Sequence, residues 1–308
     1  MSFSARLKDE ICLLPSNPVS LYSELNAIIR YDALISKDFI SFTFENPAVA
    51  RRVFRDIKQS FNISCHVSVR RQKRLRAKAI YIIEIKEQID SILERFNIVK
   101  DGKRCDLTLD YFADPEEMSS FVRGVFLVRG SITDPSTSGY HLEYVFNKKK
   151  DALFVQKLLK EMKFNLKMVV RSGRYLLYLK SSEEISDMIR MFEASNALFY
   201  FEDVRIYRDH KNMVNRLNNC EIANQEKSTK TGLKQIQIIN DLKEYDIYDL
   251  LDEKTKLVLD FRLKYPESSY NELASIIEME VGYKIGKSGI NHHFIRAKKL
   301  LESYLENN

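Results

Sequence analysis

Residues 287–301 place polar and basic side chains on one side of an expected helix and apolar side chains on the other. The apolar positions, at helical spacing, are Ile290, Phe294, Ala297 and Leu301. Arginine and asparagine can bond to base edges, serine and lysine can bond to phosphates, and an exposed basic helix fits the major groove of DNA. An ordinary amphipathic terminal helix would show the same periodicity. The polar side is predicted to contact DNA through Lys287, Ser288, Asn291, His292, Arg296 and Lys299.

Two shorter helices are expected to position this one. The first includes Leu257 and Phe261 and ends before Pro266, because the residue before a proline disfavours the helical conformation. The second begins at Ser269, which forms a Ser-x-x-Glu capping box with Glu272. Three helices in this order predict an all-α helix-turn-helix domain over residues 250–308. Ser269, at the start of its second helix, is added to the predicted DNA contacts.

The charge of the chain is unevenly distributed along the sequence. The formal net charge is +6, yet ten Lys and Arg residues face a single acid between positions 51 and 80. Residues 241–280 reverse the balance, with eleven acids and five bases. Solvated surfaces also carry such runs, but localised basic surfaces suit a polyanionic partner such as double-stranded DNA. Auxiliary phosphate contacts are predicted for the basic segment at Arg70, Arg71, Lys73, Arg74, Arg76 and Lys78.

Metal, disulfide and membrane chemistry find little support in the sequence. The alternation of an expected strand puts His141 and Glu143 on one face, and Asp134 precedes them, but neither a second histidine nor a cysteine completes a site. Four cysteines are scattered without a Cys-x-x-Cys pair, which fits reduced thiols in a cytoplasm. Neither a secretory signal nor an apolar run of about 20 residues is present. We expect no metal, no cofactor and no membrane association.

The first two hundred residues contain the same pattern of elements twice, over residues 1–100 and 101–200. Each copy follows the order helix, one or two strands, helix, strand, strand, helix. A polar stretch over residues 201–249, interpreted as connector helices, leads to the helix-turn-helix domain. The predicted class is α+β, with a duplicated αββαββα domain whose halves pack about a pseudo-two-fold axis.

The first helix of each copy carries a recognisable motif. Residues 25–33 and 122–130 resemble eroded copies of the LAGLIDADG signature of homing endonucleases, with small residues, Ala27 and Gly124, where two helices approach closely. In active members of that family the eighth motif position is an acid, and the two acids hold a divalent metal for phosphodiester hydrolysis. Here these positions are Asp32 and Arg129. Because arginine repels a cation, the resemblance implies a degenerate site without catalytic residues, in which the two side chains form an ion pair.

A more specific resemblance covers essentially the whole chain. Residues 123–143, the amino-terminal Ser2-Phe3-Ser4, the polar stretch 215–224 and the segment 287–292 are similar to the WhiA family of sporulation regulators. This resemblance implies a non-enzymatic, sequence-specific transcriptional regulator of the cytoplasm and nucleoid, acting in sporulation or in cell division and chromosome segregation. Other regulators or a co-regulating protein are further expected partners.

Two other functions remain open from the sequence. The first is an active LAGLIDADG endonuclease with an added DNA-binding tail, against which Arg129 argues. The second is a scaffold whose first two hundred residues bind a protein or a small ligand.

Overall fold

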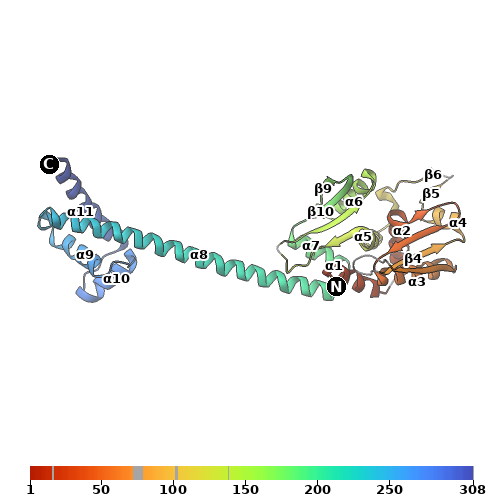
Figure 1. Cartoon of the computed structure of the whole chain (residues 1–308), viewed down its shortest axis with the longest axis horizontal. Coiled ribbons are helices and arrows are strands. Elements are labelled where there is room, and N and C mark those ends of the chain that lie inside the picture. The colour runs from red at the N-terminus through yellow and green to blue at the C-terminus, as the bar shows by residue number, and fades with distance from the viewer. Residues whose placement is uncertain (16, 72–78, 101–102, 138, 308) are drawn as a thin grey trace. The chain divides into compact units, whose positions relative to one another are not determined.

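A computed structural model describes residues 1–307 except 16, 72–78, 101–102 and 138. The chain forms two compact units, residues 1–208 and 209–308, each considered by itself below (Figure 1). No helix among the described residues is long and apolar enough to cross a membrane.

The first unit contains two copies of one arrangement. The first copy consists of α2 (Pro18–Asp32), β1 (Leu34–Ile35), β2 (Ile40–Phe44), α3 (Pro47–Phe61), β3 (Cys65–Arg71), β4 (Ala79–Ile85) and α4 (Ile89–Arg95). The second consists of α5 (Pro115–Arg129), β7 (Gly130–Ile132), β8 (Leu142–Phe146), α6 (Lys149–Glu161), β9 (Lys167–Arg171), β10 (Arg174–Leu179) and α7 (Ser182–Met191). The predicted αββαββα duplication is confirmed.

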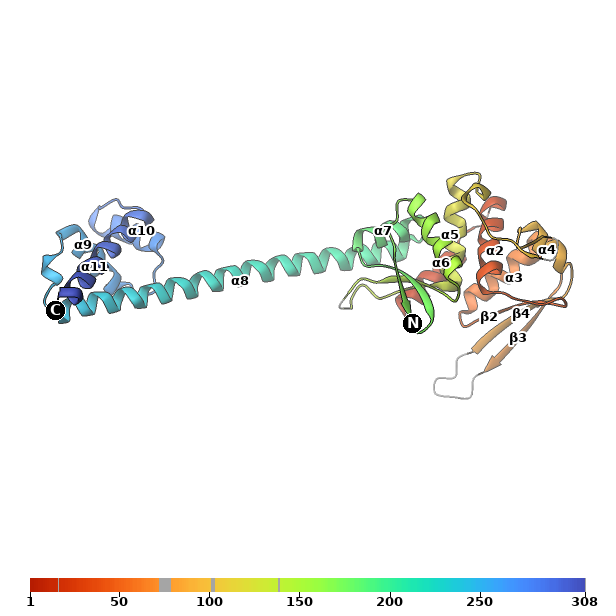
Figure 2. The same cartoon turned by 90° about the horizontal axis from the view of Figure 1, so that it is seen from above.

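Both copies build the same antiparallel sheet. The strand orders are β1-β2-β4-β3 and β7-β8-β10-β9. β2 and β8 therefore each pair with a short edge strand on one side and with a strand of the long hairpin on the other. The β9–β10 turn places Ser172 and Gly173 at positive φ, as a two-residue hairpin turn requires. Figure 2 shows the β3–β4 ribbon projecting away from the helices of its own copy.

Between the copies lie β5 (Val99–Lys100), β6 (Lys103–Arg104) and a short 3₁₀ turn, η1 (Leu109–Tyr111). One further helix, α1 (Phe3–Leu13), precedes the first copy and was not predicted from the sequence. It begins at Ser2, whose hydroxyl caps the helix, and buries Phe3, Leu7 and Ile11 in the core of the unit.

The helices α2 and α5 pack against each other at the centre of the unit. A Cβ atom added at Gly124 would lie 2.5 Å from the carbonyl oxygen of Glu24 and 2.9 Å from the Cβ of Ala27. This contact leaves no room for a side chain, so the prediction that small residues permit a close approach is confirmed. Glu24, only 1% exposed, accepts hydrogen bonds from Arg52 of α3 and Arg123 of α5 and joins three helices.

The connector is one continuous helix, α8 (Ser195–Glu244), and not the several helices expected over residues 201–249. The segment contains no proline and only one glycine, Gly232, so nothing in it interrupts the helical hydrogen bonds. α8 also begins earlier, at Ser195, inside the stretch assigned to the second copy. A 3₁₀ turn, η2 (Tyr248–Leu250), follows it.

The second unit surrounds the end of α8 with three short helices. These are α9 (Glu253–Lys264), α10 (Tyr270–Val281) and α11 (Lys287–Asn307), which Figure 1 shows gathered beside the carboxyl end of α8. Their core includes Leu259, Ile277 and Phe294, together with Ile239 and Leu242 from α8. Because α8 contributes to this core, its last turns are an integral part of the helix-turn-helix unit.

Candidate nucleic-acid interface

The start of α10 is fixed by the predicted capping box. The Ser269 hydroxyl accepts a hydrogen bond from the backbone N–H of Glu272 at 3.3 Å. The Glu272 carboxylate in turn accepts one from the backbone N–H of Ser269 at 2.7 Å, and these bonds lower the pKa of Glu272. α10 ends at Gly282, whose positive φ closes the helix before the turn to α11.

α11 presents the polar side that its sequence predicts. Ile290, Phe294 and Ala297 are buried against α9 and α10, with Leu301 further along. The opposite side is exposed at Lys287, Ser288, Asn291, His292, Arg296 and Lys299. The structure therefore gathers six of the seven predicted contacts along one helix, while Ser269 is half-buried at the start of α10. Their contacts with DNA stay a prediction.

A chain of hydrogen bonds orients Asn291. The Tyr270 hydroxyl donates to Asn291 Oδ1 at 3.3 Å and receives a hydrogen bond from Gln235 Nε2 at 2.5 Å. Gln235 belongs to α8 and is buried, so the carboxamide on α11 is held through Tyr270 by the long helix. With its oxygen engaged, the Asn291 amide is positioned as a donor toward the exposed side of α11.

Arg296 is already paired within the protein. Its guanidinium forms an ion pair with Asp252, the residue that caps the start of α9. The Thr255 backbone N–H and hydroxyl, followed by Arg296, lower the pKa of Asp252 to about 2. Both side chains of this pair are about half exposed, so the ion pair is weak and Arg296 can share it with a DNA phosphate; its contact with DNA stays a prediction.

The adjacent histidines have different environments. His292 is exposed, whereas His293 turns inward and its Nδ1 lies 2.8 Å from the hydroxyl of Thr255. Burial lowers the pKa of His293, so the neutral imidazole is favoured at that position. Among the described residues, no three metal-ligating side chains come together around this pair or elsewhere.

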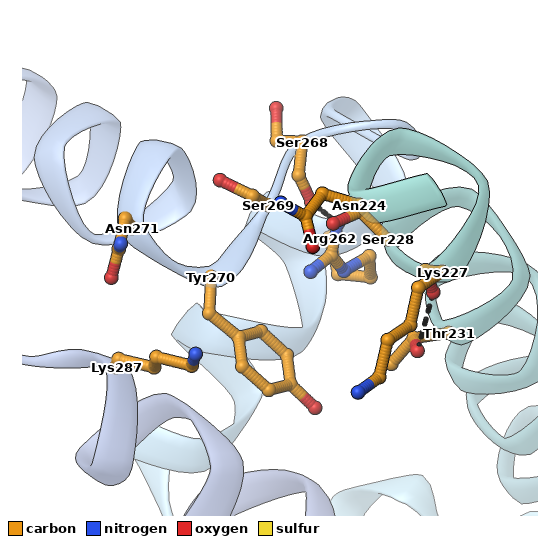
Figure 3. A pocket seen from close by; sticks show the side chains of 10 residues that line it. All are labelled: Asn224, Lys227, Ser228, Thr231, Arg262, Ser268, Ser269, Tyr270, Asn271 and Lys287. Carbon is orange, nitrogen blue, oxygen red and sulfur yellow. Dashed lines mark hydrogen bonds between the residues drawn. The ribbon is translucent and has the colours of Figure 1, made fainter. Parts of the chain in front are cut away.

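A polar cavity of about 320 Å³ lies beside these helices, within the second unit (Figure 3). Ser269 and Lys287, two of the predicted DNA contacts, line this cavity, and α8 also contributes to its wall. The α8 residues Asn224, Lys227, Ser228 and Thr231 were not among the sequence predictions. Because these polar residues are three or four positions apart, they lie on one face of α8. The interpretation of this segment as connector helices did not use that pattern.

The degenerate motif positions lie together at the ends of α2 and α5. Arg129 donates from Nε to the carbonyl oxygen of Tyr31 at 2.9 Å, and its second guanidinium nitrogen is 3.5 Å from Asp32 Oδ1. The expected ion pair is therefore present. Burial raises the pKa of Asp32, and Arg129 and then Lys8 oppose that shift. One carboxylate beside an arginine and a lysine does not fit a divalent cation, which requires several oxygen ligands.

The remaining basic and acidic candidates lie only partly within the described residues, and the predicted phosphate contacts of the basic segment stay a prediction. Arg70 and Arg71 are exposed on β3, whereas Lys73, Arg74, Arg76 and Lys78 lie outside the described residues. His141 Nε2 lies 3.1 Å from Glu143 Oε2, so the strand does bring this pair together. Asp134 points elsewhere and bonds to Arg6 and to the Tyr200 hydroxyl.

Comparisons with known proteins agree along the chain. Models of the WhiA N-terminal LAGLIDADG-like domain, the WhiA LAGLIDADG-like domain and the WhiA C-terminal HTH domain match residues 21–99, 118–211 and 214–301. The "Probable cell division protein WhiA" of Lacticaseibacillus paracasei is 35% identical over 98% of each chain, and that of Staphylococcus aureus is 34% identical over 98% of this chain and 97% of its own.

Solved structures agree in fold. The crystal structure of full-length WhiA from Thermatoga maritima, 24% identical, matches 98% of this chain and 99% of its own with a TM-score of 0.57. The separate N-terminal LAGLIDADG domain of a WhiA protein, 23% identical, covers 62% of this chain and 90% of its own with a TM-score of 0.50.

Proposed function

Because the chain belongs to the WhiA family, we propose that it is a sequence-specific DNA-binding transcriptional regulator that does not cleave DNA. The observation that carries the proposal is the exposed polar side of α11, with Asn291 oriented from behind by Tyr270. The expected process is cell division, which the relatives' name mentions. Chromosome segregation and sporulation are further expectations from the family resemblance.

In the proposed complex α11 lies in the major groove. Asn291 and His292, on the first turns of the helix, contact base edges. The Asn291 amide can donate to adenine N7, while the second lone pair of its oxygen, beside the bond from Tyr270, accepts from the adenine N6 amine. Lys287, Ser288 and Lys299 contact phosphates on either side. Arg296 keeps its partner Asp252 and acts mainly by holding α11 against α9.

The charges at the ends of α2 and α5 do not suit a cleaving site. Phosphodiester hydrolysis of the endonuclease type uses two carboxylates that hold metal ions on the scissile phosphate. The only carboxylate at the two motif positions is Asp32, and its partner Arg129 carries a fixed positive charge. We infer that the first unit keeps the endonuclease fold as a structural domain.

Fluorescence anisotropy with the full chain tests the proposed recognition. The protein is titrated against a labelled duplex selected from genomic fragments and against a scrambled duplex. Asn291→Ala should reduce the preference for the selected duplex by roughly 5- to 150-fold, the equivalent of about 1–3 kcal/mol for a paired base contact. Lys299→Gln is the matched control, because loss of a phosphate contact weakens both duplexes equally. Equal preference in wild type and Asn291→Ala would contradict the assignment.

A plasmid nicking assay with Mg²⁺ and with Mn²⁺ tests the absence of cleavage. Supercoiled plasmid carrying the selected site should stay intact with the wild-type chain. Metal-dependent nicking that disappears in Asp32→Asn would overturn the proposal and favour an active endonuclease.

A further inference from the structure

The polar cavity of the second unit is lined by three positive charges. Its wall carries Lys227 from α8, Arg262 from α9 and Lys287 from the start of α11, and no carboxylate is among its described lining residues. Figure 3 shows the Lys227 and Lys287 side chains reaching toward the Tyr270 ring from opposite sides. Three cations around one cavity repel each other unless an anion lies between them.

Arg262 is an independent indication that the cavity suits an anion. It is only 1% exposed, and among the described residues it has no carboxylate partner. One terminal nitrogen donates to the carbonyl oxygens of Tyr265 and Ser268, at 3.2 and 2.6 Å, while the buried Nε has no hydrogen-bond partner in the described part of the chain. A buried charge without a counterion is costly, and a bound anion would offset that cost.

The cavity is held in place by close packing, so its cations do not depend on loop movement. A Cβ atom at Gly232 of α8 would lie 2.2 Å from the carbonyl oxygen of Pro266, in the turn between α9 and α10. Gln235, one turn further on, bonds to Tyr270. These contacts fix the position of Lys227 relative to the starts of α10 and α11. The amino-terminal end of α10 contributes Ser269 and Asn271 to the cavity wall.

We propose that this cavity binds a phosphate of the DNA backbone, with Lys227 of α8 as a contact outside the three short helices. The inference rests on the proposed DNA-binding function and extends it, because it makes the long helix part of the interface. Lys227 and Lys287 contact the phosphate. Arg262 keeps its carbonyl partners and attracts the phosphate through its positive charge in the buried wall of the cavity. Since a phosphate is common to every sequence, the cavity contributes affinity and register without selecting bases.

The test compares Lys227→Gln with Lys211→Gln in the full chain. Both substitutions remove one exposed lysine from α8, but Lys211 does not line the cavity. Anisotropy titrations at several salt concentrations give the slope of log affinity against log salt. Each phosphate contact contributes about 0.9 to that slope, so Lys227→Gln should lower it by about 0.9. The affinity advantage of wild type over this variant should then fall roughly 3-fold between about 50 and 200 mM salt.

Lys211→Gln should keep the wild-type slope, and both variants should keep the wild-type thermal midpoint and sequence preference. Equal slopes for wild type and Lys227→Gln would overturn the inference while leaving the helix-turn-helix function intact. Absence of any DNA binding by wild type would instead remove both. A thermal-shift titration with inorganic phosphate separates a free anion from DNA. Stabilisation of wild type but not of Lys227→Gln, together with unchanged DNA slopes, would assign the cavity to a free anion and contradict a backbone contact.

Discussion

Glu24 allows the sharpest prediction about the stability of the first unit. Its carboxylate is 1% exposed and lies between two buried guanidinium groups: Arg123 Nε is 2.9 Å from Oε2, and Arg52 bonds to both carboxylate oxygens. Arg52 also donates to the carbonyl oxygens of Ile11 and Leu14. The single carboxylate therefore joins α2, α3 and α5, and through Arg52 it reaches the end of α1.

Glu24→Gln preserves the shape of this side chain and removes its charge. Arg52 would keep Asp56, at 3.6 Å, but among the described residues Arg123 forms an ion pair with Glu24 alone. Removing one partner of a buried pair costs about 3–5 kcal/mol, because the remaining charge stays buried without compensation. With a urea slope of about 2 kcal/mol/M, the unfolding midpoint of the first unit should fall by roughly 1.5–2.5 M.

The assay is urea unfolding followed by circular dichroism and tyrosine fluorescence, since the chain contains sixteen tyrosines and no tryptophan. Glu161→Gln, at the exposed end of α6, is the control and should change the free energy of unfolding by no more than about 0.5 kcal/mol. A double variant that also carries Arg123→Gln should lose less than the sum of the single losses. A loss below about 1 kcal/mol for Glu24→Gln, or strict additivity in the double variant, would refute this account of the helix interface.

Three further predictions concern local features of the two units. Gly124→Ala should lower the free energy of unfolding by about 1–3 kcal/mol in the same urea assay, because overpacking against the carbonyl oxygen of Glu24 outweighs the helix propensity of alanine; unchanged stability would contradict the close approach. Ser269→Ala should cost about 1 kcal/mol through loss of the α10 cap, seen as a lower thermal midpoint of the second unit. Asp252 has a pKa lowered to about 2, so its contribution to stability is present above about pH 4 and is lost as the pH falls toward 2. Asp252→Asn should reduce the loss of unfolding free energy at low pH. A pH dependence of stability identical to that of wild type would show that the carboxylate does not stabilise the fold.

Local patterns in the sequence predicted the helices of the second unit well. The Ser269–Glu272 box and Pro266 act on neighbouring residues, so the start of α10 and the end of α9 follow from short-range rules. The duplicated order of elements likewise predicted both sheets, because each copy repeats the same alternation of periodicities. The small residue at Gly124 predicted the contact between α2 and α5.

Contacts between residues distant in sequence were not predictable in the same way. Glu24, Arg52 and Arg123 are ordinary charged residues in helices, and only the packing of three helices buries them together. The ion pair of Arg296 with Asp252 was not predicted, because the two residues lie 44 positions apart and Asp252 serves as a helix cap. The place of Lys227 in the cavity wall was missed because α8 was interpreted as a connector, whereas its last turns belong to the core of the second unit.

Selection from a library of genomic fragments tests whether α11 selects the DNA sequence. The full chain and a full-length Asn291→Ala/His292→Ala variant are each used to capture fragments, which are then sequenced. Both substituted side chains are exposed, so the variant should fold as wild type does and should still bind DNA through its phosphate contacts. Wild type should enrich a defined set of fragments, and the variant should capture DNA without that enrichment. Enrichment of the same fragments by both proteins would contradict this prediction and would assign sequence recognition to the LAGLIDADG-like unit.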